Sequence, residues 1–431
     1  MQLLKWLYPG MKVKRWILLC VVGVIMIAMG IELCAMKEKV VEEESLIVVY
    51  SGTTLLVVGV ALLIISIRRM IKSLTGIFLP ERERLVDHVY RERQKRHLAR
   101  GPKVVVLGGG TGLSTLLRGL KEYTSNITAI VTVMDSGGSS GRLRDQLDIL
   151  PPGDIRNCLV ALAEAEPLMS ELFQYRFKEG TGLSGHSFGN LFITALSKVT
   201  GDFEKAIGES SKVLAIRGRV MPSTFSKVNL KAEYADGTTM EGEDKIPTVR
   251  KPIKRIFLQP GGNRAPVEAV EAIKGAELIV LGPGSLYTSI IPNLLIEDIL
   301  SAILTSSAIK VYVCNVMTEA GETDGYTAFD HLSALIKHTD PRVVKYCILN
   351  TDKAPKEFLA RYREEDAYPV IVDSERIKEK DYVVIEKEMM STKDFVRHDP
   401  EKLAQIIMSL VISEKGEKGT GYFLGKKKRK N

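Results

Sequence analysis

Two glycine-rich segments have the composition of anion-binding loops. Residues 108–112 read GGGTG, follow a short β-branched run and precede an apolar run with helical spacing. Where a strand passes directly into a helix, free backbone N–H groups and the positive end of the helix dipole face a ligand anion. Residues 282–285 repeat this arrangement after the apolar run 276–281. The pattern predicts a phosphate site, but the first loop is neither a full GxGxxG motif nor a Walker loop, so a simple tight turn is the alternative.

A second type of loop combines one carboxylate with small hydrogen-bonding residues. It comprises Asp135, Ser136, Gly137, Gly138, Ser139 and Ser140, and it follows a strand-like run. Asp135 lies roughly twenty residues beyond the first loop, where dinucleotide-binding folds place an acid on the ribose. We therefore expect this loop to wrap a phosphate or a sugar. A Gly/Ser linker is the alternative.

Two further segments carry polar side chains immediately before predicted helices. In residues 151–157 these are Asp154, Arg156 and Asn157. Arg156 could grip a diphosphate through two parallel hydrogen bonds, or Asp154 could be an N-cap with Arg156 as its ion-pair partner. In residues 184–190 they are His186, Ser187 and Asn190, which suit a ligand wall, although His186 could also be an ordinary surface histidine.

The last predicted strand of this group delivers Asn315, and an acidic loop follows it. Thr318, Glu319, Glu322, Thr323 and Asp324 could bind a metal ion or a sugar hydroxyl, or face solvent. No Ser-His-Asp triad or metal cage can be assigned, which favours binding over catalysis. The five cysteines form no CxxC pair and no zinc-ligand spacing, as expected for a reduced cytosolic domain without structural metal.

The elements that must position these loops alternate between strand and helix. Strand-like runs over 103–107, 127–133, 276–281 and 310–314 are separated by predicted helices, such as 113–123, 191–199 and 292–306. This order predicts an α/β fold with a Rossmann-like, doubly wound, mostly parallel sheet, whose ligands sit beyond the carboxyl ends of the strands. Short alternating stretches within 213–258 predict a small antiparallel insertion. After residue 380 the chain looks charged and helical, and beyond Glu414 it looks disordered.

Two uncharged apolar runs, 16–31 and 46–67, come before this domain. Each approaches or meets the roughly 20 residues that cross a bilayer as a helix, so we predict a transmembrane hairpin. A cleavable signal peptide is the alternative for the first run. Basic residues flank the hairpin, whereas its loop carries Glu42, Glu43 and Glu44, which predicts a two-pass cell-membrane protein with both termini and the main domain in the cytoplasm. The predicted organisation is hairpin 1–72, basic juxtamembrane linker 73–102, α/β domain 103–410 and basic disordered tail 411–431.

The net charge of +8 is concentrated near the bilayer and in the tail. Residues 1–102 hold sixteen Lys and Arg against nine acids, 426–430 add five cations, and 103–425 carry a net charge of −4. Anionic membrane lipid is therefore an expected partner, and nucleic acid is not.

Taken together, the motifs GGTG at 109–112, DSGGSSG at 135–141, PGDIRN at 152–157, GHSFGN at 185–190, GPGS at 282–285 and CNVM at 314–317 resemble the gluconeogenesis factor family. This family is the bacterial branch of the 2-phospho-L-lactate transferase superfamily, and the resemblance covers about 103–410. It implies a regulator that binds a UDP-sugar such as UDP-N-acetylglucosamine and links carbon metabolism during gluconeogenic growth to cell-wall synthesis and cell shape. Regulatory or cell-wall proteins are then expected partners, the chain could form a homo-oligomer, and no cofactor is required.

The resemblance and the loop motifs together give the expected ligand contacts, and the resemblance itself carries over Gly110 to Gly112, Asp135 to Ser140, His186, Ser187 and Asn190. The residues expected to bind the nucleotide sugar are Gly109, Gly110, Thr111, Gly112, Asp135, Ser136, Gly137, Gly138, Ser139, Ser140, Asp154, Arg156, Asn157, His186, Ser187, Asn190, Gly282, Gly284, Ser285 and Asn315. The alternative is a transferase that moves a phospho-group to a deazaflavin-type acceptor, with Asp135 or Asp154 holding Mg²⁺ and Arg156 neutralising charge. Where those enzymes tend to carry two adjacent acids, Asp135 is followed by Ser136, which argues against metal-assisted transfer.

Overall fold

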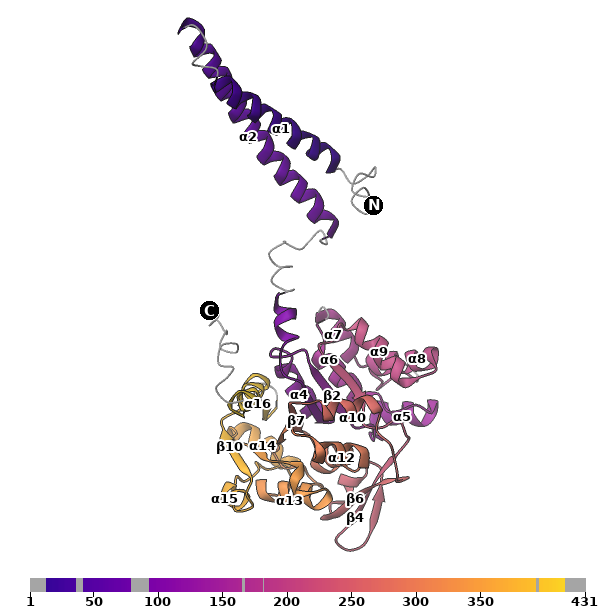
Figure 1. Cartoon of the computed structure of the whole chain (residues 1–431). Helices are drawn as coiled ribbons and strands as arrows, with labels where there is room; N and C mark the ends of the chain where they lie inside the picture. The colour runs from indigo at the N-terminus through magenta and orange to yellow at the C-terminus, as the bar shows by residue number, and fades with distance from the viewer. Residues whose placement is uncertain are drawn as a thin grey trace. The chain divides into compact units, whose positions relative to one another are not determined.

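The computed structural model describes residues 13–35, 42–78, 93–164, 167–180, 182–392 and 395–414. It divides into two compact units, Met1–Arg96 and His97–Asn431. The first holds the apolar hairpin and the second holds the α/β domain (Figure 1). Part of the predicted linker, 79–92, and the predicted disordered tail beyond Glu414 lie outside the described residues.

The hairpin consists of α1 (Val13–Ala35) and α2 (Glu42–Phe78). Each contains a stretch long and apolar enough to cross a membrane, Arg15–Ala35 and Ile47–Ile71, which confirms the two predicted spans by length and composition. The helices touch at glycines: a Cβ added to Gly30 would lie 2.8 Å from the carbonyl oxygen of Gly52. Small residues allow this close approach of two backbones, which gives helices in lipid their packing contacts. The cytoplasmic orientation stays a prediction.

The domain is built on one seven-stranded sheet in the order β10-β9-β8-β7-β1-β2-β3, with every pair of neighbours parallel. The chain runs from β1 outward to β3, returns to β7 on the other side of β1, and then continues outward to β10. The strand order therefore reverses between β1 and β7. The strands are β1 (Val104–Gly108), β2 (Ile127–Val131), β3 (Arg219–Pro222), β7 (Leu278–Leu281), β8 (Ile309–Val313), β9 (Tyr346–Asn350) and β10 (Val383–Lys387).

Both faces of this sheet are covered, as the alternation along β1 requires. Val104 and Val106 pack with one set of helices, and Val105 and Leu107 pack on the opposite face. The first set is α4 (Gly110–Leu120), α6 (Gly153–Leu162), α8 (Phe188–Thr200), α9 (Phe203–Val213) and α16 (Pro400–Glu414). The second is α10 (Val267–Lys274), α11 (Ile291–Leu294), α12 (Glu297–Thr305), α13 (Ala328–His338) and α15 (Ser374–Lys378). This is the predicted doubly wound α/β fold.

A three-stranded antiparallel sheet adds to the second face. It consists of β4 (Asn229–Tyr234), β5 (Thr239–Glu241) and β6 (Ile253–Gln259), in the order β5-β4-β6. Alternate residues of β4 are buried, so one side of this small sheet completes the core (β4 and β6 in Figure 1). The predicted antiparallel insertion is therefore confirmed.

Several predicted loops prove to be helix N-termini. The first glycine loop forms the first turn of α4, the Asp135 loop leads into α5 (Gly138–Leu147), and the third segment opens α6 at Gly153. The sequence did not predict these turns as helical because they are rich in glycine and serine, which have low helix propensity. The predicted helix over 292–306 is divided into α11 and α12, and the π-helix η4 (Leu286–Ile290) comes directly before α11.

The expectation of helix after residue 380 is wrong over 383–391 and at 397–398. This stretch forms β10, β11 (Met390–Ser391) and β12 (Arg397–His398), and helix resumes only in α16. The charged residues of this stretch gave no strand signal in the sequence. The strand β10 forms because it pairs with β9, which is distant in the sequence. The remaining elements are α7 (Pro167–Gln174), α14 (Lys356–Glu364), η3 (Ile246–Val249) and η5 (Pro341–Val343).

Candidate functional site

A cavity of about 550 Å³ opens at the carboxyl ends of β1 and β7, where the strand order reverses. Open parallel sheets bind their ligands at this point, so the fold itself favours this cavity as the site. We call it the nucleotide cavity, after the ligand class that the sequence predicts. Its lining is Gly109, Gly110, Thr111, Gly112, Thr115, Thr132, Asp135, Asp154, Glu243, Pro283, Gly284, Ser285, Thr288, Ser289, Asn315, Val316, Met317, Thr318, Glu319, Ala320, Tyr362, Glu365, Ala367, Val396, Arg397 and His398.

The backbones of the two glycine turns come into close contact where both turns line this cavity. A Cβ added to Gly112 would lie 2.7 Å from the carbonyl oxygen of Pro283, and one added to Gly109 would lie 2.5 Å from Asp154 Oδ2. Gly110 has a φ of +63°, a conformation that favours glycine. The glycines of GGTG are therefore explained by the close approach of neighbouring atoms and by the backbone conformation of Gly110. The motif places the N-terminal turn of α4 at the cavity.

Three carboxyl groups cluster beside that turn. Asp154 accepts a hydrogen bond from the Gly110 backbone N–H, Asp135 follows β2, and Glu243 comes from the loop after β5. Loss of hydration, together with the charge on Asp135, raises the pKa of Asp154 to about 7. The same two causes, with Asp154 adding to the repulsion, raise the pKa of Glu243 to about 8. Near neutral pH these two groups can therefore carry protons and donate hydrogen bonds.

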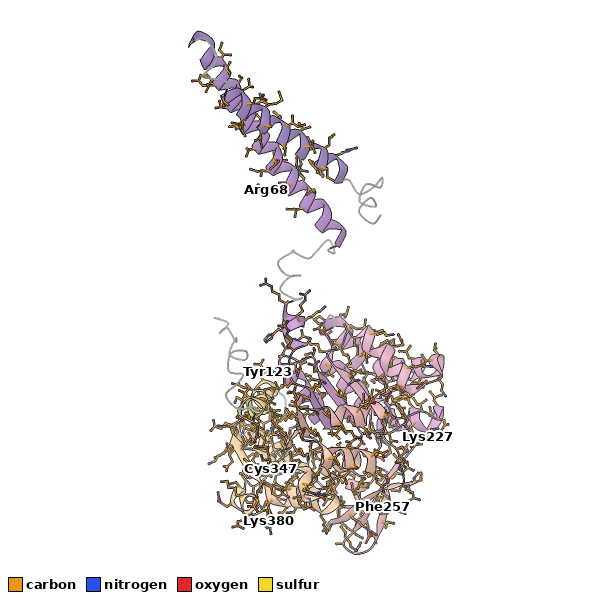
Figure 2. All side chains as sticks on the ribbon, viewed as in Figure 1. Arg68, Tyr123, Lys227, Phe257, Cys347 and Lys380 are labelled. Carbon is orange, nitrogen blue, oxygen red and sulfur yellow. The ribbon has the colours of Figure 1, made fainter. Side chains whose placement is uncertain are left out.

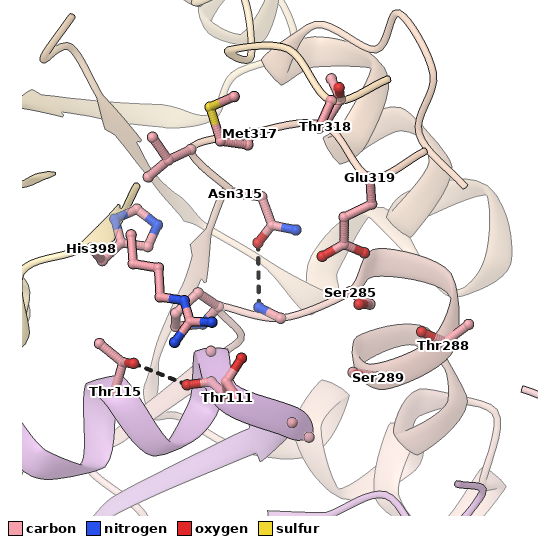
Figure 3. A pocket seen from close by; sticks show the side chains of 18 of the residues that line it. Thr111, Thr115, Ser285, Thr288, Ser289, Asn315, Met317, Thr318, Glu319 and His398 are labelled. Atoms are coloured by element: carbon pink, nitrogen blue, oxygen red, sulfur yellow. Dashed lines mark hydrogen bonds between the residues drawn. The ribbon is translucent and has the colours of Figure 1, made fainter. Parts of the chain in front are cut away.

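A second wall comes from the β7 turn and the loop after β8. The Gly284 backbone N–H donates to Asn315 Oδ1 at 3.3 Å, and the Ser285 hydroxyl donates to the Glu319 carboxylate. Figure 3 shows Asn315 and Glu319 facing Ser285, with Thr111 and Thr115 of α4 nearby. Burial raises the pKa of Glu319. This wall offers hydroxyl, amide and carboxyl groups, which suit the hydroxyl groups of a sugar.

The third wall comes from the C-terminal part of the domain, which sequence reasoning missed entirely. Tyr362 and Glu365 lie at the end of α14, and Arg397 and His398 form β12. Arg397 is the only Lys or Arg side chain in the described lining. His398 Nε2 donates to the Cys314 carbonyl at 3.0 Å, and burial lowers the pKa of His398 to about 4, so the ring is neutral at physiological pH (Figure 3). These residues follow no glycine loop, so no local signal marked them.

Not all predicted site residues reach the cavity. Gly109 to Gly112, Asp135, Asp154, Gly284, Ser285 and Asn315 line it. Ser136, Gly137, Gly138, Ser139, Ser140, Arg156, Asn157, His186, Ser187, Asn190 and Gly282 are not among its lining residues.

Most of the excluded polar side chains form one buried network behind the carboxyl cluster. Ser139 Oγ lies 2.9 Å from His186 Nδ1 and accepts from Asn190 Nδ2 at 3.1 Å. Arg156 donates to Ser187 Oγ at 2.5 Å and to Asn157 Oδ1 at 2.8 Å. The network joins α5, α6 and α8, so its contacts hold the helix N-termini that carry Asp154 and the Asp135 loop. The structure thus gives Arg156 internal partners.

No group of three or more His, Cys, Asp or Glu side chains could hold a metal ion within the described ranges. Cys158, Cys314 and Cys347 are free and buried in the domain (Cys347 is labelled in Figure 2).

Comparison with known proteins identifies the domain. Residues 104–390 match the family model described as 2-phospho-L-lactate transferase CofD. The gluconeogenesis factor of Bacillus subtilis is 48% identical over 311 residues, which cover 72% of this chain and 98% of the relative. A relative from Nostoc sp. is 47% identical over 423 residues, covering 94% of this chain and 92% of its own. A crystal structure of a UPF0052 family member from Bacillus halodurans shares 50% identity with a TM-score of 0.70, covering 72% of this chain and 99% of that one.

The shorter relatives align almost end to end with the domain, so they consist of little else. The Nostoc relative instead aligns across nearly the whole chain, hairpin region included. These matches and the glycine-lined switch-point cavity lead to one conclusion: the chain belongs to the gluconeogenesis factor family, with a domain of the 2-phospho-L-lactate transferase type.

Proposed function

We propose that the nucleotide cavity binds a UDP-sugar of the UDP-N-acetylglucosamine class, and that the chain acts as a regulator linking gluconeogenic carbon metabolism to cell-wall synthesis and cell shape. The observation that carries the proposal is the meeting of two glycine turns at the switch point. It aims one helix N-terminus at a cavity of about 550 Å³, within the range of roughly 300–1,000 Å³ typical of small-molecule sites.

The electrostatics of the cavity support binding of a diphosphate without a metal ion. Asp154 and Glu243 have raised pKa values, so each can donate a proton to a phosphate oxygen as a hydrogen bond. Arg397 supplies a guanidinium, which matches phosphate geometry. The wall with Asn315 and Glu319 would then contact sugar hydroxyl groups.

The test is calorimetric titration of UDP-N-acetylglucosamine into the full chain in non-ionic detergent with EDTA. Arg397→Ala should weaken binding by about 10- to 150-fold, since a hydrogen bond to a charged group is worth about 1.5–3 kcal/mol. Arg361→Ala is the matched control, because Arg361 and Arg397 both lie over the Phe395 ring but only Arg397 lines the cavity. Equal losses in both variants, or no binding by the wild type, would contradict the proposal.

The hairpin would place this sensor at the cell membrane. Both termini and the domain would be cytoplasmic, with basic flanks against anionic lipid. Regulatory or cell-wall proteins would receive the signal there, and self-association into a homo-oligomer would bring several domains together. Protease protection in sealed vesicles tests the orientation. Added protease should degrade the domain in inverted vesicles and should leave it intact in right-side-out vesicles.

The match to a transferase family favours one alternative, transfer of a phospho-group to a deazaflavin-type acceptor. Mg²⁺ usually needs only one or two carboxylates plus substrate phosphates, and Asp135 and Asp154, which both line the cavity, would be those carboxylates. Asp135→Asn separates the functions: a binder should lose affinity in Mg²⁺ and in EDTA alike. A transferase should lose only Mg²⁺-dependent product, so product formed by the wild type alone would replace the sensor proposal.

A further inference from the structure

A second cavity, of about 640 Å³, shares the loop 319–326 with the nucleotide cavity. Glu319 lines the nucleotide cavity, whereas Glu322, Asp324 and Tyr326 line the second one. Its other side chains come from the segment after η3 and from the segment after α14, where Tyr368 lies. Neither cavity's lining includes a residue of the other, so the second cavity is a separate site. We call it the amine cavity, for the reason that follows.

Glu322 is the residue of this cavity whose hydrogen-bonding capacity the protein leaves partly unused. Only 7% of the residue is exposed. This carboxyl accepts hydrogen bonds from Thr288 Oγ1, at 3.1 Å from Oε1, and from the Tyr287 backbone N–H, whereas Oε2 is buried with no partner of its own in the described part of the chain. Burial and the neighbouring Glu319 raise the pKa of Glu322 well above its ordinary value. A buried carboxyl of this kind is stabilised by a positive hydrogen-bond donor.

The charges around the cavity select the sign of a ligand. The two cations in the lining already have acidic partners: Arg250 pairs with Asp366 at 3.1 Å, and Lys251 pairs with Asp236 at 2.5 Å. Within the described ranges Asp324 has one hydrogen-bond donor, the neutral Gly321 backbone N–H at 2.8 Å, and no ion-pair partner. The charges left without an opposite partner are therefore acidic, which disfavours an anion.

The remaining groups distinguish an organic cation from a metal ion. No triad of carboxylates, histidines or cysteines in the described chain is placed to hold a metal. Two tyrosine rings line the cavity instead, and Tyr326 is fixed by a 2.8 Å hydrogen bond between its hydroxyl and that of Tyr287. Aromatic faces attract ammonium groups, and an ammonium has three donors and no acceptor.

We propose that the amine cavity binds a small aliphatic amine, whose ammonium group pairs with Glu322 and Asp324 and lies against the ring of Tyr368. The site does not depend on the identity of the ligand in the nucleotide cavity. Its chemistry requires only that the ligand carry a protonated amine on a short apolar chain.

The experiment titrates putrescine into the full chain in non-ionic detergent, with 1-butanol as a neutral probe of the same chain length. The wild type should bind putrescine and not butanol. Glu322→Gln should raise the Kd at least about tenfold, since it removes the charge but keeps the Thr288 contact. Tyr368→Ala should raise it about two- to fivefold; this side chain is 48% exposed, so the fold should survive.

Glu268→Gln is the matched control, since Glu268 is an exposed carboxylate of α10 outside both cavities. It should leave the putrescine Kd unchanged. Circular dichroism on each variant verifies folding. Failure of the wild type to bind putrescine at millimolar concentration, or unchanged binding by Glu322→Gln, would overturn the proposal.

Occupancy of the amine cavity should also strengthen binding in the nucleotide cavity, a consequence that rests on the proposed UDP-sugar function. Glu322 contacts Thr288, and Ser285 contacts Glu319; Thr288, Ser285 and Glu319 line the nucleotide cavity. The positive charge of an amine bound beside Glu322 offsets acidic charge on the loop that the two cavities share, which favours an anionic ligand in the nucleotide cavity.

Titrating UDP-N-acetylglucosamine with and without saturating putrescine measures this coupling. Tighter binding with putrescine is expected in the wild type and not in Glu322→Gln, with a reciprocal effect on the putrescine Kd. Independent binding of the two ligands would refute the coupling. If UDP-N-acetylglucosamine does not bind at all, the proposed function fails, while the putrescine titration still decides the amine site.

Discussion

Asp154→Asn should reduce the dependence of the domain's stability on pH. In the folded protein the pKa of Asp154 rises from 3.8 to about 7, because of lost hydration and the charge on Asp135. The folded state therefore holds this proton more tightly than the unfolded state. Its contribution to stability is complete below pH 3.8 and is lost as the pH rises through 7. Asparagine keeps an oxygen for the Gly110 N–H but has no proton to lose.

The magnitude follows from the shift. About 3 pKa units correspond to up to about 4 kcal/mol across the whole window, of which about 2 kcal/mol falls between pH 5.5 and pH 8. The difference in unfolding free energy between variant and wild type should therefore grow by about 2 kcal/mol over that interval, in favour of the variant. Because the repulsion between Asp154 and Asp135 is part of this shift, the gain measures how far the site is destabilised in its charged form.

The assay is urea unfolding of residues 97–431 in EDTA, at half-unit steps from pH 5.5 to 8. Far-UV circular dichroism is the suitable signal, because both tryptophans, Trp6 and Trp16, precede this fragment. Asp145→Asn is the control, since Asp145 is an exposed carboxylate on α5. Its profile should parallel the wild type. A difference between Asp154→Asn and wild type that stays constant with pH would refute the reasoning, since it would mean that the carboxyl does not change charge in this range.

Three further outcomes are expected. Thr111→Ala should weaken UDP-N-acetylglucosamine binding by about 10- to 150-fold in calorimetry, if its hydroxyl contacts the diphosphate; unchanged affinity would make the loop a simple turn. Gly112→Ala should destabilise the domain by about 1–3 kcal/mol in urea unfolding, because its Cβ would meet the Pro283 carbonyl. Gly208→Ala on α9 is the control, since a Cβ there meets open space, and an equal cost in both variants would be inconsistent with that contact. Removal of residues 1–96 should yield a soluble domain that retains ligand affinity, and a fragment that does not fold would contradict two independent units.

Local patterns in the sequence predicted the parallel sheet and one end of the site. The glycine turns after β1 and β7 each follow a buried strand, so their position at the carboxyl edge of the sheet follows from βα alternation. That β1 and β7 are neighbours is known only from the strand order in the structure. Asp135 and Asp154 follow from the same logic, because each lies immediately before or within the first turn of a helix. The hairpin was likewise evident, since a bilayer imposes its length on any helix that crosses it.

The other half of the cavity depends on contacts that no local pattern encodes. Glu243 belongs to the antiparallel insertion and reaches the carboxyl cluster because Ser136 bonds to Asp244 at 2.5 Å. Arg397 lies in a two-residue strand within a stretch that was predicted to be helical. Conversely, His186 and Arg156 had the composition of ligand contacts, but their partners are other side chains of the domain. Polar residues near glycine loops can serve the ligand or the loop, and only tertiary structure distinguishes the two uses.

The position of β12 near the end of the chain also sets the order in which the cavity is completed during synthesis. The hairpin leaves the ribosome first and the glycine loop soon after it, but Arg397 and His398 are made 285 or more residues later than Gly112. At a rate of synthesis of roughly 5–20 residues per second, Arg397 and His398 are added roughly 15–60 s after the glycine loop. Throughout that time α4 also lacks α16, whose first residue, Pro400, packs against Gly119. A nascent or prematurely terminated chain can therefore carry the hairpin without a complete cavity, so under the proposed function only finished molecules would bind the ligand.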